Sequence, residues 1–114
     1  MDEIAFRTTP YFERLAKKML PQGALDAVVA ELRVNPHKGD VIQGTGGARK
    51  IRVSLPGRGK SGGARVIYVY VEVYGVIFFL LIYTKNQQAD LTDTQRKTLR
   101  TAIREIKEAL DGTE

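Results

Sequence analysis

The spacing of apolar residues predicts two helices in the first third of the chain. Apolar side chains recur at intervals of three and four over residues 10–20 and again over 24–34, which is the spacing of a helix that buries one face. Thr9 suits the N-cap of the first helix and Pro10 its first turn. The second helix is expected to end before Pro36, because the residue preceding a proline disfavours helical backbone.

The middle of the chain has the pattern of strands instead. Residues 50–55 alternate between polar and apolar, which predicts a strand with one buried face. Residues 65–73 are rich in Val, Ile and Tyr, and residues 76–83 form an apolar run without alternation, which is typical of a central strand covered on both faces. Shorter strands are expected at residues 3–7 and 41–42, and a C-terminal helix between Thr92 and Gly112.

This order of elements predicts an α+β fold. Two N-terminal helices and a C-terminal helix are expected to pack on a mostly antiparallel sheet of four or five strands. The length of 114 residues suits a single domain over residues 1–114.

The positive charge of the chain is concentrated in one segment. Residues 49–65 contain six basic residues and no acidic one, whereas residues 1–48 contain six of each and residues 66–114 contain six basic and seven acidic residues. The whole excess of +5 therefore lies within 49–65. An exposed loop without a ligand could carry such charges, but a focused basic patch is typical of nucleic-acid binding and favours an anionic partner.

Other compositional features exclude several classes of function. The chain has no cysteine and a single histidine, His37, which excludes disulfides and a two-histidine ribonuclease site. No carboxylate–histidine cluster has metal-ligand spacing, so we expect neither metal nor cofactor. We find no signal peptide, and the longest apolar run is eight residues where a spanning helix needs about 20, so we expect a soluble cytoplasmic protein with no membrane partner.

The basic segment is expected to bring several cations together. Lys50 and Arg52 are two residues apart on one strand and so share a face, and Arg65 begins the next strand. If those strands pair, the intervening loop brings Arg58 and Lys60 to the same rim. Long basic side chains could simply cover a sheet face, but like charges side by side are unfavourable and an anionic ligand would remove that cost.

Such a cluster can catalyse RNA cleavage without histidine or metal. Cations stabilise the negative charge that grows on phosphoryl oxygens in the transition state, and they can lower the pKa of a neighbouring lysine or tyrosine. RNA supplies its own nucleophile, the 2′-OH. Tyr83 and Lys85, at the end of the apolar strand, are candidates for proton transfer. Tyr68 and Tyr70 are weaker candidates, because strand tyrosines more often serve packing.

Several strings of the chain resemble the HigB-type branch of the RelE/ParE superfamily of toxins. They are GDVIQGTGG at 39–47, RKIR at 49–52, PGRGKSGG at 56–63 followed by RVIY at 65–68, YTKN at 83–86 and DLT at 90–92. The resemblance covers nearly the whole chain. It implies a microbial-ribonuclease-like α+β fold and a toxin of a type II toxin–antitoxin system that cleaves mRNA in the ribosomal A site. It also implies a neutralising antitoxin, often with a helix-turn-helix domain, through which the complex reaches operator DNA.

The resemblance also assigns residues. Those at positions that the resemblance marks as catalytic are Lys50, Arg52, Lys60, Arg65, Tyr83 and Lys85. Apart from the resemblance, we expect Arg49, Arg58, Tyr68 and Asn86 to contact RNA or the ribosome. Asn86 stands where RelE enzymes carry a second arginine, and the C-terminal tyrosine of RelE has no clear counterpart. The cationic clamp is therefore better defined than the proton donor and acceptor.

Two other functions fit the same pattern. A gyrase-inhibiting toxin of the ParE kind shares the fold and lacks nuclease activity, although the density of cations over 49–65 speaks against it. A non-catalytic RNA-binding module would bind RNA in a salt-sensitive manner without cleaving it.

Overall fold

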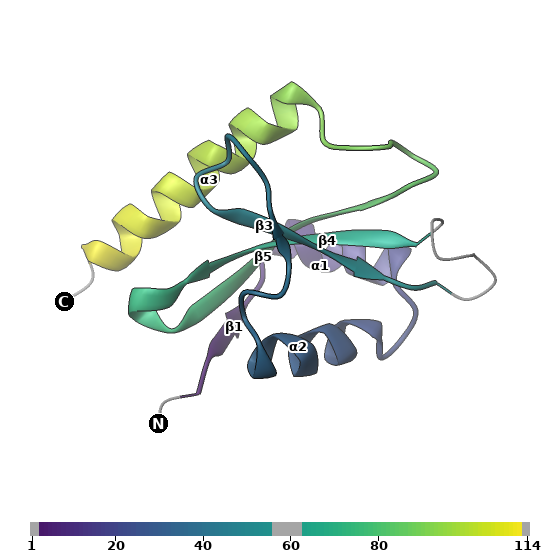
Figure 1. Ribbon diagram of the computed structural model, residues 1–114, viewed down its shortest axis with the longest axis horizontal. Coiled ribbons are helices and arrows are strands. Elements are labelled where there is room, and N and C mark those ends of the chain that lie inside the picture. The colour runs from purple at the N-terminus through teal and green to yellow at the C-terminus, as the bar shows by residue number, and fades with distance from the viewer. Residues whose placement is uncertain (1–2, 56–62, 113–114) are drawn as a thin grey trace.

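A computed structural model describes residues 3–55 and 63–112 of the chain, and it has an α+β architecture built on one five-stranded sheet (Figure 1). The strand order is β1-β5-β4-β3-β2, and every neighbouring pair is antiparallel except β1 and β5, which are parallel. The strands are β1 (Ala5–Arg7), β2 (Asp40–Val41), β3 (Ala48–Val53), β4 (Ala64–Val71) and β5 (Val76–Thr84). The helices are α1 (Pro10–Met19), α2 (Ala24–Val34) and α3 (Asp93–Asp111).

The helices begin at the residues that the local sequence signals predict. The Thr9 hydroxyl accepts a hydrogen bond from the Phe12 N–H at 3.0 Å at the start of α1. Thr92 and Gln95 form both halves of a capping box at the start of α3. None of the helices described is both long and apolar enough to cross a membrane.

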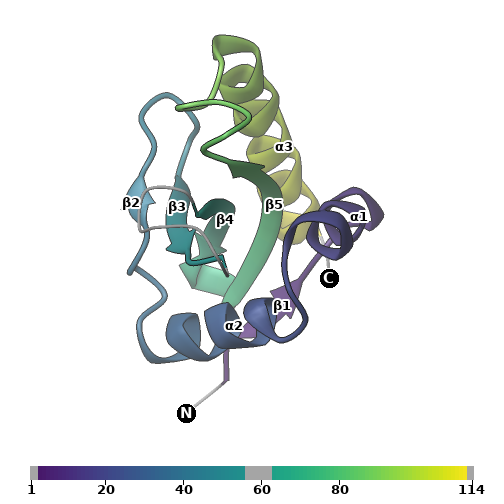
Figure 2. The same ribbon diagram turned by 90° about the vertical axis from the view of Figure 1, so that its right-hand side faces the viewer.

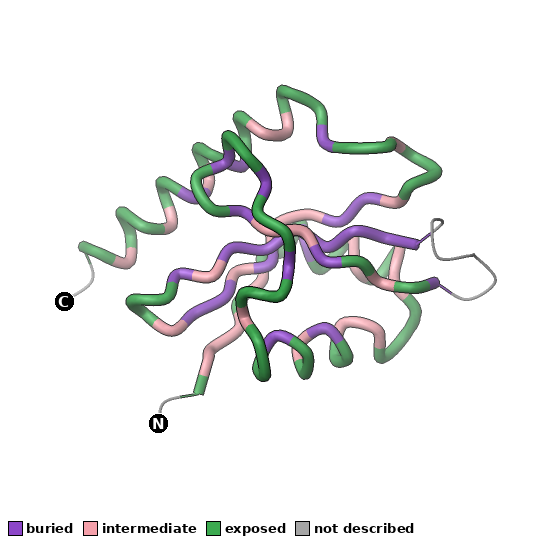
Figure 3. The backbone as a smooth tube through the Cα atoms, in the orientation of Figure 1, coloured by how far each residue is buried: buried purple, intermediate pink, exposed green. Residues whose placement is uncertain are grey.

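The sheet separates two hydrophobic cores, with α1 and α2 on one face and α3 on the other (Figures 1 and 2). On the first face Phe12 stacks on Phe79 with ring centroids 5.3 Å apart, and Leu32 of α2 is fully buried. On the second face Leu99 and Ile103 of α3 cover the sheet. Because both faces are covered, the strands in the middle of the sheet are buried along most of their length (Figure 3).

The apolar run 76–83 forms β5, an interior strand covered on both faces as expected, although β4 is the middle strand of the five. β5 is indeed packed against both cores, but it lies between β1 and β4. The side chains of β5 do not alternate strictly between the two faces of the sheet, because the strand contains an extra residue. Tyr68 pairs with Phe79 while Ile67 pairs with Leu81, so Leu80 is an extra residue in a β-bulge, and Leu80 and Leu81 both pack toward the α3 core.

Candidate active site

One cleft gathers most of the residues that the sequence led us to expect as catalytic. It has a volume of about 240 Å³ and is lined by Asp40, Lys50, Arg52, Arg65, Tyr83, Lys85 and Ala89. Five of the six residues expected to be catalytic therefore line the same cavity. The sixth, Lys60, and the RNA-binding candidate Arg58 lie outside the described residues. Asn86 is exposed in the turn after β5 and does not line the cleft.

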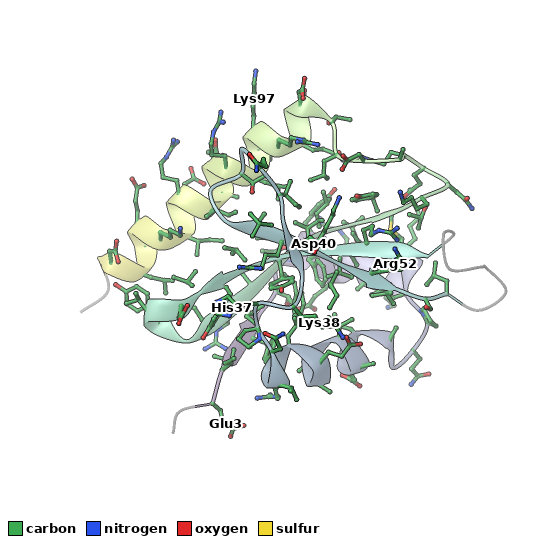
Figure 4. The ribbon with its side chains drawn as sticks, viewed as in Figure 1. Glu3, His37, Lys38, Asp40, Arg52 and Lys97 are labelled. Atoms are coloured by element: carbon green, nitrogen blue, oxygen red, sulfur yellow. The ribbon has the colours of Figure 1, made fainter. Side chains whose placement is uncertain are left out.

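The register of the sheet explains why these side chains meet. Arg52 of β3 is directly opposite Arg65 of β4, which is directly opposite Tyr83 of β5. The three residues thus form one row across three adjacent strands and project from the same face, the one that carries α3. In Figure 4 Arg52 lies toward the end of the sheet where β3 ends and β4 begins.

A second row lies beside the first. Lys50, two residues before Arg52, is paired with Asp40 of β2, so both side chains project toward the cleft. Lys85 follows β5 directly, and its ammonium group donates a hydrogen bond to the Ala89 carbonyl at 3.3 Å. The cleft therefore has cations on both sides, supplied by β3 and by the segment after β5.

Arg65 is the most buried cation of the cleft, with only 8% of its surface exposed. Its Nη1 donates to the Ala64 carbonyl at 3.4 Å, and no ion pair among the described residues includes it. It also faces Arg52 across the strand pair, and like charges directly opposite are destabilising. A buried positive charge in this setting is unfavourable for folding and favours an anionic ligand.

Tyr83 differs electrostatically from what the sequence suggested. We expected neighbouring cations to lower its pKa. Arg65 and Arg96 do act in that direction, but burial of the phenol raises the pKa of Tyr83 more strongly and the charge of Asp90 adds to the increase. Tyr83 is consequently a neutral phenol at physiological pH and suits a proton donor rather than an acceptor.

Two charged residues of the site were missed from the sequence. Asp90 Oδ1 is 3.9 Å from Lys50 Nζ, and Asp90 Oδ2 is 3.2 Å from Arg96 Nη2. Arg96 belongs to α3, so the start of that helix forms part of the site. The sequence carried only a weak signal for this contact. Asp90 lies in the loop before α3 and Arg96 lies in the helix, and the distance between a loop residue and a helix residue six positions later is not fixed by regular geometry. Within the described residues no group of three or more His, Cys, Asp or Glu side chains could hold a metal ion.

Two residues expected to contact RNA have structural roles on the other face of the sheet. The expectation that Tyr68 contacts RNA is wrong, because its side chain is 0% exposed and lies in the core that α1 and α2 cover. Its hydroxyl accepts from the Gly39 N–H and donates to the Pro36 carbonyl, both at 2.9 Å. Arg49, paired with Tyr68, donates to the carbonyls of His37 and Gly39 at 3.0 and 2.7 Å.

The Tyr68 contact also explains why position 39 is glycine. A Cβ at Gly39 would lie 2.8 Å from the Tyr68 ring, which is too close for any other residue. The hydroxyl and the Arg49 guanidinium together hold the segment between α2 and β2 against the sheet, on the face away from the cleft.

Comparison with known proteins agrees with this geometry. Residues 5–112 match the family model described as the RelE toxin of the RelE/RelB toxin-antitoxin system. Among solved structures, the fold is similar to that of an arginine-to-alanine double mutant of the E. coli toxin RelE in the free state, with a TM-score of 0.58 and 15% sequence identity over 77% of this chain and 90% of that chain. This chain is therefore a member of the RelE toxin family of toxin–antitoxin systems, whose members pair with a cognate antitoxin.

Proposed function

We propose that this toxin is a ribosome-dependent mRNA endonuclease of the HigB-type branch that cleaves RNA without a metal ion. The observation that carries the proposal is the position of Arg65, a buried cation in one row with Arg52 and Tyr83. An arrangement that is unfavourable for folding and lines a cleft is best explained by the anion that it binds. The strings at 39–47 and 56–68 support the HigB-type branch.

The proposed reaction uses the RNA's own 2′-OH. Its oxygen attacks the adjacent phosphorus, the bond to the 5′-oxygen breaks, and the products are a 2′,3′-cyclic phosphate and a 5′-OH end. Arg65 and Arg52 stabilise the charge that develops on the phosphoryl oxygens. Tyr83, a neutral phenol, donates its proton to the departing 5′-oxygen. Lys50 and Lys85 are the candidates for the group that accepts the 2′-OH proton, and the one that does so acts in its neutral amine form, because an ammonium group has no acceptor.

The size of the cleft suits part of a polymer. At about 240 Å³ it lies just below the range of about 300–1,000 Å³ that encloses small-molecule ligands. It has room for a phosphodiester with its adjoining sugars. The rest of the RNA would then be held elsewhere, and we propose that the ribosomal A site, in the cytoplasm, supplies that support. Lys60 and Arg58 complete the proposed cationic rim, and a helix-turn-helix antitoxin is the proposed neutralising partner.

The proposal is tested by mapping mRNA 5′ ends in a translating extract that contains the wild-type toxin or Arg65→Ala. We expect the wild type to produce new 5′ ends within reading frames and Arg65→Ala to produce almost none. Arg104→Ala, which removes an exposed arginine from α3, is the matched control and should cleave normally. Full cleavage by Arg65→Ala would refute the assignment.

Two further assays, of DNA supercoiling and of RNA binding, separate the two alternatives. Intact mRNA together with inhibited DNA supercoiling would indicate a gyrase-directed toxin of the ParE kind. RNA binding that weakens steeply with salt, without any cleavage, would indicate a binding module.

A further inference from the structure

Besides Asp40, which lines the cleft, a second carboxylate lies beside it, next to the cation Lys50. Asp90 is 3.9 Å from the Lys50 ammonium and 3.2 Å from the Arg96 guanidinium, and its Oδ1 accepts a hydrogen bond from the Leu91 N–H at 2.8 Å. The Leu91 N–H holds the pKa of Asp90 below its usual value, and Lys50, Arg96 and Lys85 lower it further against the effect of partial burial. Asp90 is therefore ionised and forms ion pairs with Lys50 of β3 and Arg96 of α3.

The position of Asp90 is determined by the segment around it. Thr84 N–H donates to Gln87 Oε1 at 2.9 Å, and Gln88 Nε2 donates to the Asp90 carbonyl at 2.6 Å. Gln88 Nε2 also contacts Gln95 Oε1 at 2.8 Å, and Gln95 is part of the capping box of α3. These hydrogen bonds tie the segment after β5 to the first turn of the helix, so the carboxylate is held at this place by its surroundings.

Arg96 has donors that the carboxylate does not use. A guanidinium has five N–H donors, and here Nη2 contacts Asp90 while Nε is buried without a partner in the described part of the chain. The side chain is 32% exposed and thus accessible to a ligand entering the cleft. Arg96 also lies close enough to Tyr83 to influence the phenol electrostatically.

We propose that Asp90 occupies the position of an RNA phosphate in the free protein, and that Arg96 is a phosphate ligand of the site. When RNA binds, a phosphate oxygen replaces the carboxylate on Lys50 and Arg96. The inference rests on the proposed function, because it needs RNA as the ligand of the cleft. Carboxylate and phosphate compete for the same donors, so Asp90 weakens the affinity of the free toxin for isolated RNA.

The test measures binding rather than cleavage. The probe is a short single-stranded RNA with 2′-O-methyl riboses, which cannot be cleaved by 2′-OH attack, and its affinity for purified toxin is followed by fluorescence anisotropy over a series of salt concentrations. Asp90→Asn should bind about three- to tenfold more tightly, the effect of removing one or two exposed ion pairs. Its slope of log affinity against log salt should be steeper by about 0.7, the equivalent of one phosphate charge, because no displaced carboxylate takes up a counterion when the RNA binds.

Arg96→Gln should change both quantities in the opposite direction. It removes a phosphate ligand, so affinity should fall by a similar factor and the salt slope should become shallower by about 0.7. Arg96→Lys retains one charge but fewer donors and should lie between wild type and Arg96→Gln. The matched control is Asp93→Asn, which makes the same charge change in the first turn of α3, and its affinity should stay within twofold of wild type.

Circular dichroism spectra and thermal midpoints identify any variant that does not fold. If Arg96→Gln does not fold, Arg96→Lys and Asp90→Asn carry the test. Unchanged or weaker binding by Asp90→Asn would overturn the inference, as would unchanged binding by a folded Arg96→Gln. An equal gain from Asp93→Asn would show a general charge effect and would also overturn it. Because the probe cannot be cleaved, these outcomes are distinguishable from a failure of the nuclease proposal.

Discussion

Replacing Arg65 with methionine should make the protein more stable and nearly inactive. The substitution keeps much of the side-chain volume and removes a charge that is 8% exposed and has no carboxylate partner among the described residues. Relief of the repulsion from Arg52 should contribute about 0.2–1 kcal/mol. Relief of the burial of an unpaired charge should bring the total gain in the free energy of unfolding to about 1–2 kcal/mol.

The same substitution should reduce RNA cleavage by a much larger factor. Removal of one preorganised donor from a transition-state site typically lowers the catalytic rate by about 10²–10³. Arg65 is the only cation in this row that is buried, so solvent cannot replace it easily. Stability and activity should therefore change in opposite directions, which is expected of a residue retained for its chemistry.

Two assays on the same preparations check this prediction. Thermal unfolding followed by circular dichroism should show a midpoint about 4–8 °C above wild type. Single-turnover cleavage of mRNA on programmed ribosomes should show the loss of rate. Arg52→Met is the control, because it relieves the same repulsion from an exposed position and should change stability by less than about 1 kcal/mol. A loss of 2 kcal/mol or more in Arg65→Met would show that Arg65 holds the fold together and would refute the reasoning.

Three further predictions follow from the tyrosines. Tyr68→Phe leaves the Gly39 N–H and the Pro36 carbonyl without their partner, so urea denaturation should show a loss of about 2–3 kcal/mol, whereas cleavage per folded molecule should stay within twofold of wild type. Tyr83→Phe should fold normally and cleave about 10²–10⁴ times more slowly in single-turnover assays, and normal cleavage would exclude Tyr83 as the proton donor. Burial raises the pKa of Tyr68 and of Tyr83 in the folded state, so the folded protein keeps these protons when the unfolded chain loses them. Stability measured by urea denaturation should accordingly be unaffected by these groups below pH 10 and should fall as the pH rises above it, and a flat profile there would contradict the burial of both phenols.

Much of the fold could be predicted because its signals are local. Thr9 before Pro10 and Thr92 before Gln95 specify helix starts through contacts within four residues, and the structure shows both. The alternation over 50–55 placed Lys50 and Arg52 on one face, since side chains on a strand alternate strictly. Antiparallel pairing of successive strands then brought Arg65 beside them without any further information.

The features that could not be predicted depend on distant partners. Tyr68 was expected to contact RNA, although packing was the commoner role for a strand tyrosine, and the groups that decide between the two, at Pro36 and Gly39, are about 30 residues away in the chain. Asp90 and Arg96 are close in the sequence, but their contact depends on how the segment after β5 folds against the start of α3. The parallel pairing of β1 with β5 likewise joins segments about 70 residues apart in the chain and has no local signal.

The extra residue at Leu80 has a consequence for the chemistry at the end of β5. Before the bulge, odd-numbered residues such as Ile77 and Phe79 face α1 and α2, whereas after it Tyr83 faces the opposite side, in line with Arg65. In a strand of uninterrupted alternation, the phenol would point into the wrong core and the cleft would have no such proton donor. The bulge therefore sets the phase of the strand, and one inserted residue decides on which side of the sheet Tyr83 lies and thus where the proposed active site can form.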